Sequence, residues 1–212
     1  MVIKGSMQKK QFEIGNEAFV ISKLDEGETV KAFDCGDDDL NDFIVNECVH
    51  YRKEKLAVTY VLEPEEDVAH EHVAAFFSLA NDRISLVDFD NKTQYNRFSK
   101  RFNNHKRLKS YPAVKIGRLG VSLAMKGQAL GSFLLRFIKM YFLLDNKTGC
   151  RFITVDACSA DVPFYLKNGF VPLNDDDIDD PTRLLYFDLN DMSDKLLTPK
   201  PLNLEMQNIQ RS

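Results

Sequence analysis

The stretch between residues 117 and 138, GRLGVSLAMKGQALGSFLLRFI, holds the residues of this chain that are best spaced for chemistry. A β-rich run passes into a short loop that contains Gly127 and leads, from Gly131, into an apolar pattern typical of a helix. Such a strand-to-helix turn directs several backbone N–H groups and the positive end of the helix dipole toward one point. Lys126 and Gln128 add a positive charge and a hydrogen-bond donor at its edge. On the residues alone, this junction indicates an anion site for a phosphate or diphosphate, although similar junctions also serve simple packing.

The loop differs from the two best-known phosphate-binding motifs. A P-loop requires Gly-x-x-x-x-Gly-Lys-Ser/Thr and a Rossmann fingerprint requires Gly-x-Gly-x-x-Gly, and this stretch fits neither. Its glycines must serve another kind of turn, because glycine costs backbone entropy unless a positive φ or a close approach requires it.

The composition indicates one globular domain with a substantial core. The chain has 212 residues, of which 44% are hydrophobic, and its formal net charge is −4. This charge argues against a protein coated in positive charge but leaves room for a local basic face. No run of about 18 apolar residues is present and no signal peptide is recognised, so we expect a cytoplasmic protein without a membrane partner.

The side chains that most often bind metals are not spaced for that role. The four cysteines include no Cys-x-x-Cys pair and the four histidines are scattered, so we expect reduced, packed thiols and no metal cofactor. Residues 174–181, NDDDIDDP, resemble a calcium loop only loosely, because the glycine and the terminal glutamate of an EF-hand loop are missing. This stretch is predicted to be a solvated acidic loop.

The hydrophobic patterning along the chain predicts a mixed α/β fold. Strands are predicted at 18–24, 57–65, 72–86, 113–122, 150–157 and 183–189, of which 72–86 forms one or two strands with a turn near Asn81 and Asp82. Helices are predicted after the acidic residues 37–39, from about residue 131, and over 161–168, with a left-handed cap at Gly169.

Residues 88–112 interrupt this pattern with basic and aromatic side chains. One interpretation is a solvated amphipathic helix followed by a loop that ends at Pro112. The other is a basic surface for an anionic substrate such as RNA, with contacts from Lys100, Arg101, Lys106 and Arg107.

The strand-to-helix junction resembles the acyl-CoA motif of the Gcn5-related N-acetyltransferase (GNAT) superfamily. In that motif a strand of the type Arg-Leu-Ala-Val leads into Gln/Arg-x-x-Gly-x-Gly/Ala and then a helix, and residues 126–131 occupy those six positions. Lys126 stands for Gln/Arg and keeps the positive charge. Ala129 stands for the first glycine, where its methyl group lies in the expected path of the diphosphate while its N–H is retained.

A second stretch, CRFITVDACSADVPFYLKNGF, resembles the later half of the superfamily, in which a strand precedes a helix ending in Phe-Tyr-x-x-x-Gly-Phe. The corresponding residues are Phe164, Tyr165, Gly169 and Phe170. The resemblance implies a GNAT fold of the α/β (α+β) class, with a central mixed, mostly antiparallel twisted sheet of about six to seven strands, flanked by helices and splayed at the acyl-CoA site.

The resemblance also implies a domain plan. Residues 17–190 would form the acetyltransferase domain, with 88–112 as a basic insertion. Residues 1–16 would be an N-terminal extension in which Gly-Ser-Met resembles a tag remnant and Met7 is an alternative native start. Residues 191–212 would be a C-terminal extension, either disordered or lying as a strap over the core.

The implied function is an acetyl-CoA-dependent N-acetyltransferase in which a primary amine attacks the thioester directly. The resemblance places the Val121 N–H at the thioester carbonyl and makes Tyr165 the general acid, whereas the local sequence alone would let Tyr165 simply pack between Phe164 and Phe170. The residues that it assigns to acetyl-CoA are Leu119, Gly120, Val121, Lys126, Gly127, Gln128, Ala129, Leu130, Gly131 and Ser132.

The acceptor amine remains open at this stage. Asp82 and Asp156 are candidates for a general base, but each is equally well placed as a turn or strand-edge residue. An α-amine, with a reference pKa near 7.7–8.0 against about 10.4 for lysine, would need only a water chain.

Two alternatives stand beside the general acetyltransferase. The stretches FDCGDDDLNDFI, AAFFSLANDRISL and PAVKIGRLGV are similar to a branch of toxin-like acetyltransferases that modify aminoacyl-tRNA. The other alternative is a non-catalytic acyl-CoA-binding module, for which Ala129 is the indication. A homodimer is compatible with each of them.

Overall fold

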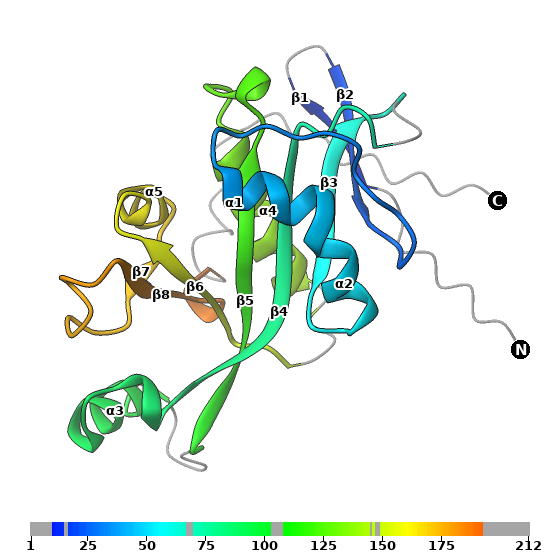
Figure 1. The fold of residues 1–212 in the computed structure, drawn as a ribbon. Coiled ribbons are helices and arrows are strands. Elements are labelled where there is room, and N and C mark those ends of the chain that lie inside the picture. Colours follow the sequence, from blue (N-terminus) through cyan, green and yellow to red (C-terminus); the bar gives the residue numbers. More distant parts are fainter. Residues whose placement is uncertain are drawn as a thin grey trace, which may run out of the picture. The chain divides into compact units, whose positions relative to one another are not determined.

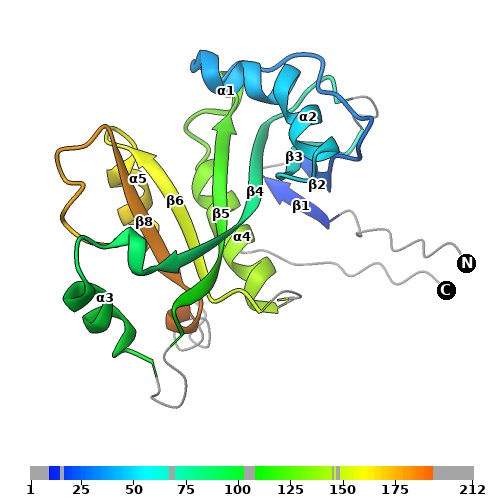
Figure 2. The same cartoon turned by 60° about the horizontal axis from the view of Figure 1, so that its bottom comes forward.

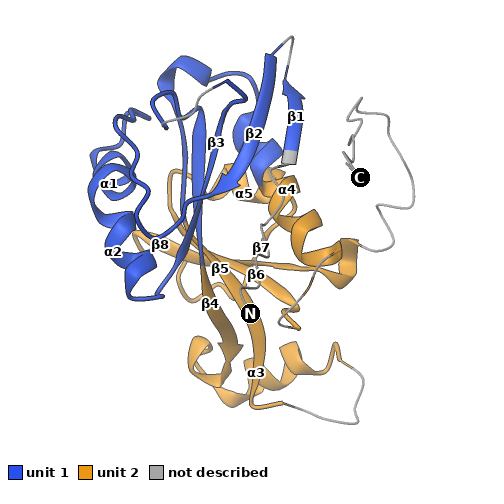
Figure 3. Ribbon diagram, turned by 90° about the vertical axis from the view of Figure 1, so that its right-hand side faces the viewer, with its two compact units in different colours: residues 1–79, 118–134, 199–212 blue, residues 80–117, 135–198 orange. Residues whose placement is uncertain are grey.

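The structure is a computed structural model that describes residues 10–14, 17–66, 70–102, 108–144, 146 and 149–192. The chain divides into two compact units (Figure 3). Unit 1 comprises residues 1–79, 118–134 and 199–212, and unit 2 comprises residues 80–117 and 135–198. Strands β4 (Ala75–Ser85) and β5 (Ser110–Val121) and helix α4 (Leu130–Leu144) each begin in one unit and end in the other.

The strands form an 8-stranded sheet in the order β1-β2-β3-β4-β5-β6-β8-β7 (Figure 1). Strands β5 and β6 pair in parallel, whereas the pairs β1–β2, β2–β3, β3–β4, β6–β8 and β7–β8 are antiparallel. The predicted mixed, mostly antiparallel sheet is therefore confirmed. The predicted strand number is too low because β1 (Lys10–Ile14) and the two-residue β7 (Val171–Pro172) were not recognised.

Unit 1 packs a short helical segment against the first strands. Its elements are β1, β2 (Glu17–Lys23), α1 (Asp38–Asp42), the π-helical turn η1 (Phe43–Glu47), α2 (Cys48–Lys53), β3 (Val58–Pro64), the 3-10 turn η3 (Leu123–Met125) and the adjoining parts of β4, β5 and α4. The Asp37 carboxylate caps α1 by accepting from the Leu40 N–H at 3.0 Å, as the acidic start of the predicted helix suggests. Phe43, Ile44 and Cys48 bury one side of this segment against Val61 and Phe76.

Unit 2 is built around an aromatic core. Its further elements are the 3-10 turn η2 (Leu86–Asp88), α3 (Lys92–Ser99), β6 (Phe152–Cys158), α5 (Val162–Lys167), β7 and β8 (Thr182–Asp188). Figure 2 shows α3 beside the end of β4 and the start of β5.

The ladder between β5 and β6 pairs residues 113–115 with 152–154, although both strands continue beyond these pairs. A ladder this short agrees with the predicted divergence of the two strands.

The turn predicted near Asn81 and Asp82 is wrong, because β4 is continuous through both residues. The Asp82 carboxylate accepts a hydrogen bond from the Thr154 hydroxyl, so this polar side chain is satisfied within the sheet and needs no turn. Pro112 also lies inside a strand rather than at the end of a loop. Its side chain is exposed, and its carbonyl accepts a hydrogen bond from the Arg151 N–H at 3.0 Å.

The predicted terminal extensions lie mostly outside the described residues. In the N-terminal one, Lys10–Ile14 form β1 and pair with β2. In the C-terminal one, only Asp191 and Met192 are described. Within the described ranges, no helix combines the length and the apolar character needed to cross a membrane.

Candidate active site

The predicted anion site lies in unit 1, in the connection between β5 and α4. Two backbone bonds fasten this connection: the Ser122 N–H donates to the Ala74 carbonyl at 2.9 Å and the Leu123 N–H donates to the Asp34 carbonyl at 2.9 Å. The turn η3 follows, closed by a bond of 2.9 Å from the Met125 N–H to the Ser122 carbonyl. The loop that leads into α4 therefore starts from a tethered base.

The backbone N–H groups of residues 127–132, here called the amide cradle, have no acceptor within the described part of the chain. The first α4 bond that closes on this loop runs from the Phe133 N–H to the Ala129 carbonyl at 3.0 Å. Residues 126–129 are exposed, and a Cβ at Gly127 would meet no atom within 4 Å. Consecutive free donors at the start of a helix are the arrangement that binds phosphate groups, and they agree with the predicted anion site.

Two residues of the cradle have a left-handed backbone. Gly127 has φ +85° and Ala129 has φ +57°. Ala129 therefore retains the conformation that the glycine of the superfamily motif would adopt readily, at a cost of about 1–2 kcal/mol for a residue with a Cβ.

Replacing Ala129 with glycine should relieve this strain and raise the free energy of unfolding by about 1 kcal/mol, measured by denaturant titration without ligand. The matched control is Ala124→Gly, because Ala124 is exposed in η3 without a positive φ and should lose stability instead. A loss of stability in both variants would contradict the strain at position 129.

Three of the predicted coenzyme residues, Leu119, Gly120 and Val121, lie at the end of β5. Gly120 is buried, and a Cβ there would lie 2.6 Å from a ring carbon of Phe76 and 3.2 Å from one of Phe33. Close packing in unit 1 thus accounts for this glycine without a ligand. The flanking Leu119 and Val121 are half-buried at the end of β5.

Lys126 is exposed, and its ammonium reaches over Gly36 in the loop before α1. Gly36 has φ +82°. Lys126 directly precedes the amide cradle in the chain, and its ammonium lies over the loop before α1. The Gln128 side-chain amide contacts only the Met125 sulfur, at 3.9 Å, among the described residues.

Tyr165 lies in unit 2, on α5, and is 7% exposed. Its ring contacts those of Phe164 and Phe170, with centroid distances of 5.1 and 5.5 Å. Burial raises the pKa of the phenol above its usual value of 10, and the nearby Asp161 and Cys158 raise it further. Within the described residues the Tyr165 hydroxyl has no hydrogen-bond partner. The phenol therefore keeps its proton at neutral pH and does not donate it to another group of the described chain.

Both candidate bases have partners in the sheet of unit 2. Asp156 on β6 pairs with Lys115 on β5, and Asp82 on β4 accepts from the buried Thr154 hydroxyl. These contacts give each carboxylate a structural role. The sequence left two roles open for Asp82 and Asp156, a general base or a residue of the sheet, and these contacts support the second role.

The aromatic side chains of the predicted basic segment belong to the core and do not form an RNA-binding surface. Tyr95, Phe98, Phe102 and Tyr111 pack with Phe152 and with one another. The rings recur between the basic residues because they pack in or against the core of unit 2. Tyr95 and Phe98 do so from α3, Phe102 from the segment after it and Tyr111 from β5.

Two of the four basic residues predicted to contact RNA lie at the surface of the described structure. Lys100 and Arg101 are exposed, and the Arg101 guanidinium donates to the Tyr186 hydroxyl and lies 5.6 Å from the Phe98 ring centroid. The other two predicted RNA contacts, Lys106 and Arg107, lie outside the described residues.

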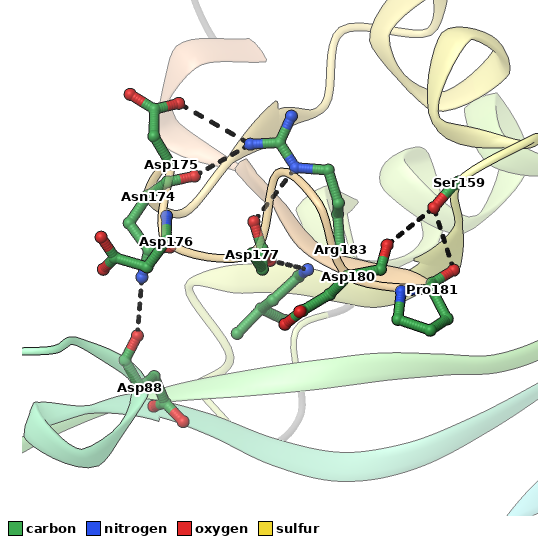
Figure 4. Close-up of polar contacts among 10 residues, drawn as sticks. Asp88, Ser159, Asn174, Asp175, Asp176, Asp177, Asp180, Pro181 and Arg183 are labelled. Carbon is green, nitrogen blue, oxygen red and sulfur yellow. Dashed lines mark hydrogen bonds and ion pairs between the residues drawn. The ribbon is translucent and has the colours of Figure 1, made fainter.

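The acidic loop at 174–181 has a defined set of contacts (Figure 4). Arg183 donates to the Asp177 carboxylate at 3.0 Å and to the Asn174 carbonyl at 3.1 Å. The Ser159 hydroxyl donates to the Asp180 carbonyl at 2.8 Å. The loop is thus tied to the β6–α5 connection. Over the described residues, no group of three or more His, Cys, Asp or Glu side chains is arranged to hold a metal.

The sequence analysis missed Lys139, which the structure places beside the helix that carries Tyr165. Its Nζ donates to the Asn168 carbonyl at the end of α5. The available signal was a single lysine inside the apolar run FLLRFIKMYFLL, where a charge is expensive unless it has a partner.

The sequence matches no family model. The fold is shared with solved structures of bacterial toxins. AtaT complexed with acetyl-methionyl-tRNAfMet has a TM-score of 0.66 at 21% identity, over 85% of this chain and 99% of that chain. A tyrosine-to-phenylalanine mutant of KacT has a TM-score of 0.66 at 19% identity, over 84% and 98%. AtaTR bound with AcCoA has a TM-score of 0.62 at 21% identity, over 85% and 98%. At these identities the likeness establishes the fold, and it confirms the predicted GNAT architecture.

Proposed function

We propose that this protein is an acetyl-CoA-dependent N-acetyltransferase that transfers acetyl to the α-amine of an aminoacyl-tRNA. The observation that carries the proposal is the amide cradle at residues 127–132, with free donors at the head of a helix and Lys126 beside it. The shared fold supports the same chemistry, because the solved relatives include one bound with AcCoA and one complexed with acetyl-methionyl-tRNAfMet.

The cradle fits the diphosphate of coenzyme A. Its backbone donors are geometrically fixed by α4 and by the tethered start of the loop, and they would satisfy anionic oxygens without a change in conformation. Gly127 leaves the approach open, and the Lys126 ammonium would compensate part of the negative charge. The bound coenzyme would supply an activated acetyl thioester.

Two groups of the chain would then act on the reaction. The Val121 N–H, at the end of β5, would donate to the thioester oxygen as negative charge develops there, a contribution of about 3 kcal/mol for a well-aimed donor. Tyr165 would give its phenolic proton to the departing sulfur. As the C–N bond forms and the C–S bond breaks, the amine loses one proton to water and the phenol is reprotonated from solvent.

The acceptor class follows from the proton balance. An amine must be neutral to attack, and both candidate carboxylates, Asp82 and Asp156, are engaged within the sheet. An α-amine, whose reference pKa is near 7.7–8.0, is substantially neutral at physiological pH, whereas lysine at about 10.4 is not. This favours an aminoacyl ester over a lysine side chain and explains how the enzyme would work without a dedicated base.

The direct test measures acetyl transfer from radiolabelled acetyl-CoA to three acceptors: charged tRNA, a lysine-containing peptide and a free amino acid. We expect transfer to charged tRNA, with acetyl-CoA binding seen independently by calorimetry. Binding without turnover on any acceptor would identify a non-catalytic module, and the absence of binding would refute the coenzyme site itself.

Contact with tRNA predicts a salt-dependent affinity. Replacing Lys100 and Arg101 together with alanine should weaken tRNA binding and flatten the plot of log K against log salt by about 0.7–0.9 for each phosphate contact removed. The matched control is the pair Lys23→Ala and Lys53→Ala, exposed lysines on β2 and α2. Equal slopes in both double variants would remove Lys100 and Arg101, which follow α3, from the RNA interface.

A further inference from the structure

Lys139 is a buried cation in the second half of α4, in unit 2. It is 6% exposed, and burial lowers the pKa of its ammonium from 10.5 to about 8. Within the described residues it forms no ion pair with a carboxylate. A lysine in such a place costs free energy unless its remaining contacts stabilise the charge, so the identity of those contacts indicates its role.

The contacts of Lys139 converge on the end of α5. Its Nζ donates to the Asn168 carbonyl, and the same nitrogen lies 4.8 Å from the Phe170 ring centroid and 3.9 Å from the Phe187 ring centroid. A carbonyl in the last turn of a helix carries partial negative charge, and aromatic faces attract cations. The ammonium therefore has one acceptor and two aromatic surfaces around it.

The same end of α5 holds Tyr165 in place. The Phe170 N–H donates to the Tyr165 carbonyl at 3.1 Å and the Gly169 N–H donates to the Leu166 carbonyl at 2.9 Å. With Gly169 at φ +82°, these bonds form a Schellman motif, whose usual apolar contact is here the Phe170 ring against the Tyr165 ring. The backbone and the ring of Tyr165 are both fixed by residues 168–170.

We propose that Lys139 is a positioning residue for Tyr165: by holding Asn168 and Phe170 it fixes the helix end that sets the place of the phenol. The inference rests on the proposed function, because it assumes that Tyr165 is the general acid. Lys139 itself touches neither coenzyme nor acceptor in this role. The arrangement also gives a reason for keeping a lysine where an apolar residue would pack at lower cost.

The test compares Lys139→Met, which keeps the length of the side chain and removes its donor, with Arg136→Met, which removes an exposed charge three residues earlier on the same helix. We expect Lys139→Met to lower kcat by about tenfold to a hundredfold, the range for a small displacement of a catalytic group, with the affinity for acetyl-CoA unchanged. Arg136→Met should leave both values unchanged.

A double-mutant cycle separates positioning from general loss of structure. When Tyr165 is already phenylalanine, the change Lys139→Met should lower kcat no further, because there is no phenol left to misplace. A full additional loss in that background would overturn the proposal.

A third readout does not depend on activity. Hydrogen exchange of the Gly169 and Phe170 amides should be about tenfold faster in Lys139→Met than in Arg136→Met. Should Lys139→Met fail to fold, Phe187→Leu, which removes one aromatic surface and keeps the lysine, should give a smaller effect of the same kind. If the wild type transfers no acetyl at all, the proposed function fails. If neither Lys139→Met nor Phe187→Leu changes the exchange rates of the Gly169 and Phe170 amides, Lys139 does not stabilise the end of α5.

Discussion

Replacing Tyr165 with phenylalanine should lower kcat for acetyl transfer by about 10²- to 10⁴-fold, the usual contribution of a general acid, and leave the affinity for acetyl-CoA unchanged. The reason is that the ring, which packs against Phe164 and Phe170, is preserved while the proton for the leaving sulfur is removed. Single-turnover kinetics and calorimetry measure the two quantities separately.

The control for this variant is Tyr95→Phe in the same unit. The Tyr95 hydroxyl donates to the Leu108 carbonyl at 2.6 Å, so its removal should cost about 1 kcal/mol of stability and leave kcat unchanged. If Tyr165→Phe lost kcat and coenzyme affinity equally, Tyr165 would be a packing residue and its catalytic role would be refuted.

The same phenol predicts the pH dependence of the enzyme. Burial, Asp161 and Cys158 raise the pKa of Tyr165, and a general acid must be protonated to act. A raised pKa therefore extends activity on the alkaline side, and no loss of kcat assignable to this group should occur below its unperturbed pKa of about 10. An alkaline limb near pH 8 that disappears in Tyr165→Phe would contradict this.

Reversing the charge at Lys126 should weaken acetyl-CoA binding by about thirtyfold. One pair of charges at about 4 Å in water is worth about 1 kcal/mol, so replacing attraction with repulsion changes the binding free energy by about 2 kcal/mol. Lys126→Glu should leave stability nearly unchanged, because the side chain is exposed. The measurement is the Kd for acetyl-CoA by calorimetry at low salt.

Two controls make the result specific. Lys53→Glu makes the same change of net charge at an exposed position on α2 and should leave the Kd unaltered. Raising the ionic strength should narrow the difference between Lys126→Glu and the wild type, because exposed charges are screened. Equal affinities for both lysine variants would place the diphosphate away from the amide cradle.

Local patterns in the sequence were sufficient for the elements whose signals are local. The acidic start of α1, the left-handed Gly169 and the apolar period of α4 each depend on neighbouring residues alone, and all were predicted. The strand-to-helix turn was predicted for the same reason, since a β-rich run, a loop with glycines and an apolar helical pattern follow one another directly in the chain.

Elements that depend on distant partners were missed or misassigned. The turn predicted at Asn81 and Asp82 does not exist, because the Asp82 side chain is satisfied by Thr154 on β6, a residue 72 positions away. Strand β1 exists through its pairing with β2, and the two residues of β7 through their pairing with β8. Periodicity carries no information about such partners.

By itself, the sequence determined most of the elements in their order, the turn between β5 and α4, and the motif that contains Tyr165, because these follow from residues close together in the chain. Only the tertiary structure decided what surrounds them. It assigned Gly120 to packing against Phe76, gave Ala129 its left-handed backbone, and brought Lys139 to the end of α5. The physical reason is that desolvation, steric contact and hydrogen bonding depend on which atoms meet in space, and a single sequence does not state this.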